Sequence, residues 1–299
     1  MVYETEKLNE FATLLKRYAS KDGVSFTSNK HVGLIRESFA HRKIPACFEP
    51  SLIFVGQGQK SCYVGDHVYK YSAGNLLVVF LPTPVETEII GATTEYPFLA
   101  AGIRVDLVRF TNMLLKIENA DSDAMKPISA SSSSIFTMPL HDLLLDAVIR
   151  LLNTVENPRD AAILSDSIID EIYYRILVDD KGGDLRFLLQ QRGEIRRISK
   201  AIEYIHHNLD KQISIEGLAE MVHMSRTTFY ESFRNMMYMS PLQYVKAMKL
   251  HKAKTLLSEG NRVNETGYLV GYNSPSQFSR EFKHYFGYAP SETPVLITG

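Results

Sequence analysis

Residues 225–234 read Ser-Arg-Thr-Thr-Phe-Tyr-Glu-Ser-Phe-Arg, and residues 274–283, 49 positions further on, read Ser-Pro-Ser-Gln-Phe-Ser-Arg-Glu-Phe-Lys. Both copies begin with a serine, carry two phenylalanines four residues apart and end on a cation. A proline closes each unit, at Pro241 and Pro290. A sequence that repeats at this spacing indicates a duplicated supersecondary unit.

Each copy predicts a helix that follows a shorter helix and a tight turn. Ser225 and Ser274 are placed to cap these helices, because a serine side chain accepts a hydrogen bond from a free backbone N–H. The two phenylalanines of each copy share one helix face, since residues four apart are neighbours on a helix. Shorter helical patterns precede the caps, at residues 215–222 and 263–270. This order is typical of the helix-turn-helix, which lays its second helix in the major groove of DNA.

The C-terminal part resembles the AraC/XylS family of transcriptional regulators, over about the last hundred residues. Two positions depart from the family pattern: Gly267 and Tyr238 replace an alanine and a small residue, so we expect helix packing there to differ in detail. Further upstream, residues 48–60 resemble a branch of the family that has a cupin-like N-terminal domain. The C-terminal resemblance rests on the second copy above and on Leu218-Ala219, Met224-Ser225, Ser240-Pro-Leu-Gln-Tyr244, Lys249-Leu250, Ala253, Leu256-Leu257, Val270-Gly-Tyr272 and Phe286-Gly287.

Upstream of the repeat, the hydrophobic period is close to two. Short runs of this kind with turn signals between them are typical of a β-sandwich or barrel. The fold class we expect is α+β: an N-terminal cupin-like β-barrel with flanking helices, and a C-terminal all-α domain with two helix-turn-helix units. The predicted strands are residues 31–36, 51–57, 60–64, 67–71, 76–81, 86–90 and 97–105, with a tight hairpin turn at Gly65-Asp66.

The charged, glycine-bearing stretch at residues 179–184 is the best candidate for a domain boundary. We expect a cupin-like sensor or dimerisation domain over residues 1–180, a linker over 181–191 and an AraC-type DNA-binding domain over 192–299. The polar segment 118–134 predicts a loop. Other predicted helices cover residues 8–18, 106–115, 197–208 and 241–257, and the last of these joins the two units.

Two further predicted helices, residues 140–155 and 161–177, carry broad apolar stripes. One interpretation is that each packs on the barrel of its own chain. The other, which the resemblance favours, is that part of this surface pairs two subunits. The sequence leaves both open and makes a homodimer the expected assembly.

Composition is that of an ordinary globular protein: 299 residues, 45% hydrophobic and 22% charged. The net charge of −1 hides an asymmetry, because residues 192–299 hold 14 Lys and Arg against 10 Asp and Glu, leaving 19 against 24 elsewhere. A basic C-terminal part suits a polyanion such as DNA. No apolar run approaches the ~20 residues of a membrane span, and the charged N-terminus does not read as a secretory signal. We therefore expect a cytoplasmic protein.

Helix periodicity separates the inward phenylalanines from an outward face on each recognition helix. Arginine can bind guanine through two hydrogen bonds, and glutamate can accept one from cytosine. The resemblance implies base contacts by Thr227, Tyr230, Glu231, Ser276, Ser279 and Arg280. Arg226, Arg234 and Lys283 are better placed for phosphates, which position the protein without reading sequence. Gln277 completes the predicted DNA-binding set. The alternative is a solvated face or, for Arg280, an internal ion pair with Glu281 or a neighbour.

Catalytic and metal-binding patterns are absent from the sequence. There is no G-x-S-x-G, no phosphate loop and no GxGxxG before a helix. The histidines, including His31, His41 and His67, lack metal-ligand spacing, so we expect no metal and no cofactor. Cys47 and Cys62 are too few for a disulfide scaffold; either would be reactive if its pKa were depressed, but buried inert thiols are the simpler interpretation.

The sequence thus predicts a sequence-specific DNA-binding transcriptional regulator that acts as an effector-responsive activator, and not an enzyme. Its expected partners are double-stranded promoter DNA, a second copy of the chain, RNA polymerase and a small-molecule effector. Two alternatives stay open. The N-terminal domain could serve dimerisation alone, or it could be a cupin enzyme fused to a DNA-binding domain.

Overall fold

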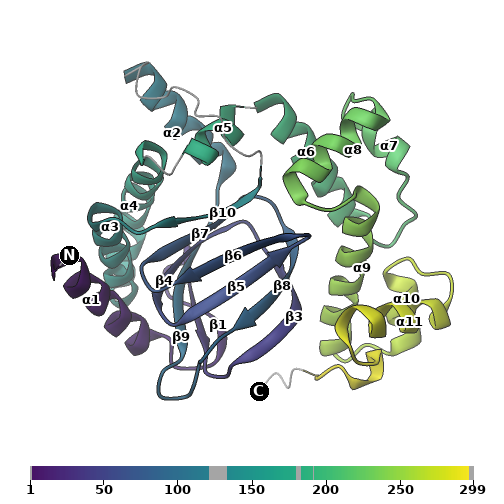
Figure 1. Ribbon diagram of the computed structural model, residues 1–299, viewed down its shortest axis with the longest axis horizontal. Helices are drawn as coiled ribbons and strands as arrows, with labels where there is room; N and C mark the ends of the chain where they lie inside the picture. The colour runs from purple at the N-terminus through teal and green to yellow at the C-terminus, as the bar shows by residue number, and fades with distance from the viewer. Residues whose placement is uncertain (1, 121–132, 180–182, 191, 296–299) are drawn as a thin grey trace.

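The computed structural model describes residues 2–120, 133–179, 183–190 and 192–295. A sheet-rich N-terminal domain and a helical C-terminal domain lie side by side, and one C-terminal helix, α9, runs along the boundary (Figure 1). The predicted α+β class is confirmed. No helix of the described residues is long and apolar enough to cross a membrane.

The N-terminal domain is built from two antiparallel sheets. The six-stranded sheet has the order β1-β2-β9-β4-β7-β10, and the four-stranded sheet has the order β3-β8-β5-β6. The strands are β1 (Gly23–Phe26), β2 (Val32–Glu37), β3 (His41–Phe48), β4 (Ser51–Gln57), β5 (Gln59–Val64), β6 (His67–Ser72), β7 (Asn75–Val79), β8 (Thr83–Ile89), β9 (Phe98–Arg104) and β10 (Ile135–Pro139).

Alternation along β4 explains the layering of this domain. Side chains of a strand point to opposite faces in turn. Leu52 and Phe54 belong to the hydrophobic cluster that includes the N-terminal helices, whereas Ile53 and Val55 belong to a second cluster with residues of the four-stranded sheet. The six-stranded sheet is therefore buried on both faces at β4, although its edge strand β1 is mostly exposed, and the space between the sheets is filled with hydrophobic side chains.

All seven predicted strands are present, and the hairpin turn at Gly65-Asp66 joins β5 to β6 with Gly65 at a left-handed φ of 56°. Three strands were not predicted: β1, β3 and β10. Every residue of β3 is half-buried or exposed, and Pro45 interrupts its pattern. The predicted loop 118–134 overlaps the end of α2, and residues 121–132 lie outside the described residues.

Helices cover the outer face of the six-stranded sheet, at the left of Figure 1. Asn157 caps α4 through its side chain, so that helix starts at Pro158, three residues before the predicted start. Most of the apolar stripe on both predicted helices is buried in the domain core, including Leu151 and Ile172. These elements are α1 (Val2–Tyr18), α2 (Leu107–Ala120), α3 (Asp142–Asn153), a short 3-10 helix η1 (Thr154–Glu156) and α4 (Pro158–Val178).

A helix, α5 (Gly183–Gln190), occupies most of the predicted linker; residues 180–182 and 191 lie outside the described residues. Arg186 is buried, and its guanidinium donates to the carbonyls of Leu177 and Asp179, which ties α5 to the end of α4. The C-terminal helices are α6 (Arg192–His207), α7 (Ile215–Met221), α8 (Arg226–Met237), α9 (Pro241–Ser258), α10 (Val263–Leu269), α11 (Pro275–Phe286) and a 3-10 turn η3 (Pro290–Glu292).

Candidate nucleic-acid interface

The first helix-turn-helix unit consists of α7 and α8. Ser225 caps α8, and its side-chain oxygen accepts from the backbone N–H of Thr228 at 3.1 Å. Phe229 and Phe233 are fully buried within the first unit. They belong to the same hydrophobic cluster as Leu218 of α7. The opposite face of α8 is exposed and carries five predicted DNA-contacting residues, Arg226, Thr227, Tyr230, Glu231 and Arg234.

The second unit, α10 and α11, repeats this construction. The Ser274 side chain accepts from the N–H of Gln277. A Cβ on Gly267 would lie 3.1 Å from Cδ1 of Phe278, so the glycine lets α10 approach the buried phenylalanine closely. This explains one departure from the family pattern. Of the predicted contact residues, Ser279 is half-buried and the other four are exposed, namely Ser276, Gln277, Arg280 and Lys283.

Some of these polar side chains already have partners within the chain. Arg226 pairs with Glu216 of α7 at 2.9 Å. The Gln277 amide donates to Glu281 at 3.2 Å. The Glu281 carboxylate also binds the Lys246 ammonium and the Tyr272 hydroxyl, and together these hydrogen bonds lower its pKa although burial opposes them. The alternative of an Arg280–Glu281 ion pair is therefore not found.

Arg234, Arg280 and Lys283 form no ion pair with any described residue. Their charges are exposed on the outward faces of α8 and α11. Cations without a protein partner can bind phosphate or base edges without first breaking an internal pair.

Helix α9 holds the two units together (Figure 1). A capping box of Ser240 and Gln243 starts the helix. Lys249, near its middle, is buried, and its ammonium donates to the carbonyls of Lys211 at 3.0 Å and Gly271 at 3.4 Å. Burial lowers the pKa of Lys249. One carbonyl precedes the first unit and the other lies in the turn of the second, so this side chain links both. Sequence analysis missed this role, because a lysine among apolar residues gives no sign of its partners.

The first unit also docks on the N-terminal domain. Tyr238, at the end of α8, has a left-handed φ of 53° and stacks on His67 of β6 with 3.8 Å between ring centroids. Ser134 donates to the carbonyl of Met236 through its backbone N–H (3.1 Å) and its hydroxyl (2.9 Å). The Tyr238 departure from the family pattern therefore lies at a contact between domains.

The tyrosine near the start of α9 makes a second contact between domains. The Tyr244 hydroxyl donates to the carbonyl of Pro82 at 2.9 Å and also lies 2.9 Å from Nε2 of His206. Burial raises the pKa of Tyr244 and lowers that of His206, which favours the neutral form of both side chains. The N-terminal domain thus contacts both the end of α8 and the start of α9.

A cleft of about 750 Å³ lies between the domains, lined by residues of β3, β5, α6 and α9. One of its cations, Lys60, is paired with Glu37 at 2.6 Å. Another, Lys254, lies 5.0 Å from the centroid of the Phe286 ring, and burial lowers its pKa. Lys254 has no ion pair with a described residue. Burial, with Lys254 nearby, lowers the pKa of His251 to about 4. Lys252 also lines the cleft and has no ion pair with a described residue, so the cleft offers two ammonium groups without a carboxylate partner.

The two thiols are not activated. Burial raises the pKa of both Cys47 and Cys62 to about 12, which disfavours the thiolate. The Cys47 sulfur lies 3.8 Å from that of Met248 in α9. Among the described residues, no group of three or more His, Cys, Asp or Glu could hold a metal ion.

The fold and this interface define a two-domain, DNA-binding transcriptional regulator. Residues 29–184 match the family model of the AraC-type transcriptional regulator N-terminus, and residues 218–294 match a helix-turn-helix domain. The chain belongs to the AraC family of transcriptional regulators.

Curated relatives agree with this assignment. The chain is 26% identical over 178 residues to a probable transcriptional regulator, LumQ, of Photobacterium leiognathi, a match that covers 58% of this chain and 68% of that protein. It is 28% identical to the lactose operon transcription activator of Staphylococcus xylosus, over 32% of this chain and 34% of that protein. Among solved structures, ToxT of Vibrio cholerae with an unsaturated fatty acid bound has a TM-score of 0.58 at 11% identity, covering 91% of this chain and 96% of that chain. This last likeness concerns the fold.

Proposed function

We propose that α8 and α11 enter successive major grooves on one side of promoter DNA and read two short sequence elements. The observation that carries this proposal is the arrangement of two 12-residue capped helices on one 18-residue helix, α9. At ~1.5 Å per residue, α9 spans roughly 27 Å. With the half-widths of the units added, this is about the ~34 Å of one DNA turn.

Base edges are proposed to be read by Thr227, Tyr230 and Glu231 in the first unit and by Ser276, Ser279 and Arg280 in the second. Arg234 and Lys283 would bind phosphates, as would Arg226 once it leaves Glu216. Gln277 would keep its hydrogen bond to Glu281 and support α11.

Selection of duplexes from a randomised library tests this proposal. We expect two short elements about one helical turn apart, and a steep fall in affinity with salt. Inserting half a turn between the elements should abolish simultaneous binding, because α9 is one uninterrupted helix that Lys249 ties to both units. Undiminished affinity for the half-turn insert would contradict it.

The cleft between the domains is proposed to bind an acidic small molecule that acts as effector. The support is that both domains line the cleft and that Lys254 has no carboxylate partner there. A ligand in this position would contact α9 and the N-terminal domain at once. It would shift the arrangement of the DNA-binding units only if it binds one arrangement better than another. The neighbouring ToxT structure contains a fatty acid, which makes carboxylic acids the first class to examine.

Thermal denaturation of the whole chain with a panel of short- and long-chain carboxylic acids tests this site. A ligand that binds the native state raises the unfolding temperature. Lys254→Met should remove the shift, whereas Lys70→Met, an exposed lysine on β6 outside the cleft, should keep it. No shift with any acid would favour the alternative that the N-terminal domain only dimerises.

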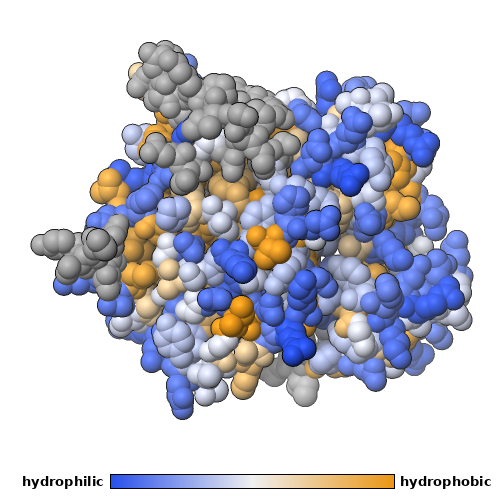
Figure 2. Space-filling model, in the orientation of Figure 1, coloured by the Kyte–Doolittle hydropathy of each residue, from blue (hydrophilic) through white to orange (hydrophobic). Residues whose placement is uncertain are grey.

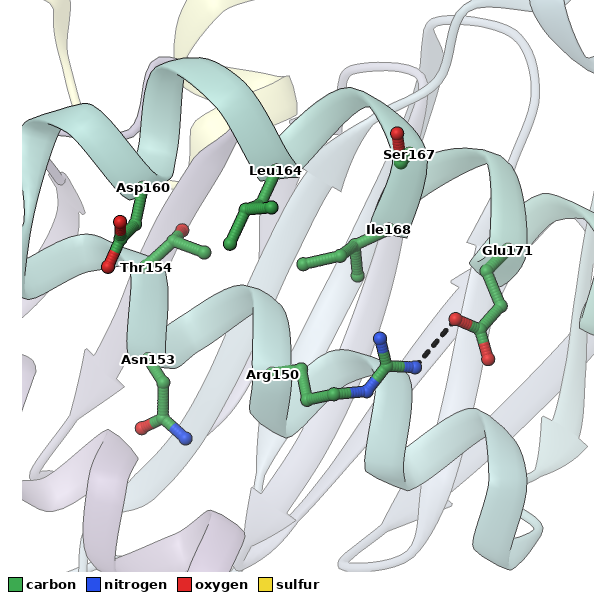
Figure 3. A pocket seen from close by; sticks show the side chains of 8 residues that line it. All are labelled: Arg150, Asn153, Thr154, Asp160, Leu164, Ser167, Ile168 and Glu171. Atoms are coloured by element: carbon green, nitrogen blue, oxygen red, sulfur yellow. Dashed lines mark hydrogen bonds and ion pairs between the residues drawn. The ribbon is translucent and has the colours of Figure 1, made fainter.

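A homodimer is the third part of the proposal. Ile163 and Leu164 of α4 are 66% and 47% exposed. Beside them, α3 and α4 form a groove crossed by the Arg150–Glu171 ion pair at 2.6 Å (Figure 3). Figure 2 shows hydrophobic side chains on this side of the molecule, whereas the surface over the DNA-binding helices is mostly hydrophilic. We propose that the outward face of α4 pairs with the same face of a second copy.

Sedimentation of the wild-type chain and of Ile163→Glu tests the dimer. Ile163→Glu should give a folded monomer. Leu151 is unsuitable for this purpose, because it is 1% exposed and belongs to the core, so a charge there would unfold the domain. A wild-type monomer at high micromolar concentration would contradict the proposal.

We also propose that the chain acts without catalysis, in the cytoplasm, and through contact with RNA polymerase. Transcription from the selected promoter by purified polymerase, with and without the chain, distinguishes activation from repression.

A further inference from the structure

We propose that a cationic stripe on α6, formed by Arg196, Arg197 and Lys200, is a phosphate-binding surface that holds the DNA backbone beside the first recognition helix. This inference rests on the proposed entry of α8 into the major groove. It adds a third element to a contact surface that the helix-turn-helix pattern confines to α8 and α11.

The stripe follows from the spacing of the sequence. Residues 193, 196, 197 and 200 stand at i, i+3, i+4 and i+7, which is one face of a helix. The opposite face carries Ile195, Ile198 and Ile202, which are buried. All three cations are exposed, and a Cβ on Gly193 would meet nothing within 4 Å, so the face is open at its N-terminal end.

The position of the stripe relates it to α8. Together with Met221, Val222 and His223, the stripe lines a groove of about 330 Å³. His223 lies in the turn of the first helix-turn-helix, two residues before the Ser225 cap, with a left-handed φ of 54°. The cations therefore flank the N-terminal end of α8. This is the end that contacts base edges in helix-turn-helix proteins, so a phosphate strand at the edge of the groove would lie next to α6.

The charges on the stripe are available to bind phosphate groups. None of the three cations forms an ion pair with a described residue. In this respect the stripe resembles Arg234, Arg280 and Lys283 on the recognition helices, and differs from Arg226, which is paired with Glu216. Double-stranded DNA carries one negative charge per ~1.7 Å of its axis, and each phosphate neutralised by a side chain releases counterions. Three unpaired cations on one helix face suit this polyanion.

Salt-dependent binding of the whole chain to its selected duplex tests the inference. For the triple variant Arg196→Ala, Arg197→Ala, Lys200→Ala, the slope of log K against log salt should become shallower by about 2 to 3, since each phosphate contact contributes ~0.9. The sequence preference should not change. Arg196→Lys with Arg197→Lys keeps both charges and should keep the slope, and Lys70→Ala on β6 is the control for loss of a distant cation.

The flanking DNA supplies a second measurement. Shortening the duplex next to the element read by α8 should weaken the wild type and leave the triple variant unaffected, with equal thermal midpoints showing that both are folded. An unchanged salt slope in the triple variant would overturn the inference. If the triple variant keeps the wild-type salt slope but no longer activates transcription by RNA polymerase, the inference is also overturned. The stripe would then be a contact surface for the polymerase. A wild type with no salt-dependent binding would instead refute the proposed function itself.

Discussion

The two helix-turn-helix units are copies of one sequence pattern, yet they differ in what they pack against. The first unit belongs to the large hydrophobic cluster that also contains the N-terminal helices, and Tyr238 and Met239 reach the cluster between the two sheets. The second unit has a cluster of its own, around Phe278, Phe282 and Phe286. The same motif therefore serves in one place as part of a domain interface and in the other as a small separate core.

This difference gives the units different roles. A change in the N-terminal domain can reach the first unit through the His67–Tyr238 stack and the Ser134–Met236 hydrogen bonds. It reaches the second through α9, which Lys249 joins to both units, and through α11, which contacts β3 directly.

Removing an equivalent core phenylalanine from each unit should produce the largest effect. Phe229→Ala and Phe278→Ala should each cost about 3–5 kcal/mol, because each ring is fully buried. Phe229→Ala should destabilise the N-terminal domain as well, whereas Phe278→Ala should loosen the second unit alone. Hydrogen exchange resolved along the chain measures this, and equal loss of protection in the N-terminal domain for both variants would refute the comparison.

Two glycines test the docking of the first unit. A Cβ on Gly65 would lie 2.6 Å from the Tyr238 carbonyl oxygen, whereas a Cβ on Gly91 would meet nothing within 4 Å. Both have a left-handed φ, so both alanine variants carry similar backbone strain. Gly65→Ala should cost about 1–3 kcal/mol more, the range for overpacking, and should expose the segment around Tyr238 to proteases. Matching midpoints in thermal denaturation would argue against a tight contact.

The residues proposed to contact base edges should differ in chemistry between the two units. Glu231 and Arg280 occupy equivalent positions 49 residues apart. Arg280→Ala should relax preference at one base pair by about 1–3 kcal/mol, and Arg234→Ala should weaken all sequences alike. Binding of both variants to every single-base mutant of the selected duplex decides this. A uniform loss for Arg280→Ala would make that residue a phosphate contact.

The smallest effect concerns the stacked rings between the domains. His67→Ala should cost about 0.5–1.5 kcal/mol, the worth of an aromatic pair, and should leave the second unit unchanged. Val68→Ala, at the exposed position beside it, serves as the control. Chemical denaturation of the two variants measures the difference, and the stack is dispensable if their midpoints coincide.

Much of the fold could be predicted because its signals are local. The caps at Ser225 and Ser274, the inward phenylalanines and the strands of the central sheet depend on residues a few positions apart. Strand β3 was not predicted, because its partly exposed residues and Pro45 obscure the alternation of hydrophobic and polar side chains. For the candidate site, periodicity identified the outward faces of α8 and α11, but it gave no indication that Gln277 is already bonded to Glu281.

The sequence by itself determined the two duplicated units, the family and the side of each recognition helix that faces outward. The tertiary structure decided which side chains have partners and which do not. It placed Tyr238 on His67, Lys249 between two carbonyls, and Arg196 beside the turn before α8. The physical reason is the separation along the sequence of the residues that interact. Helix periodicity and helix caps depend on residues that are close together in the chain. Ion pairs, stacks and clefts join residues tens to hundreds of positions apart, whose meeting depends on how all the elements pack.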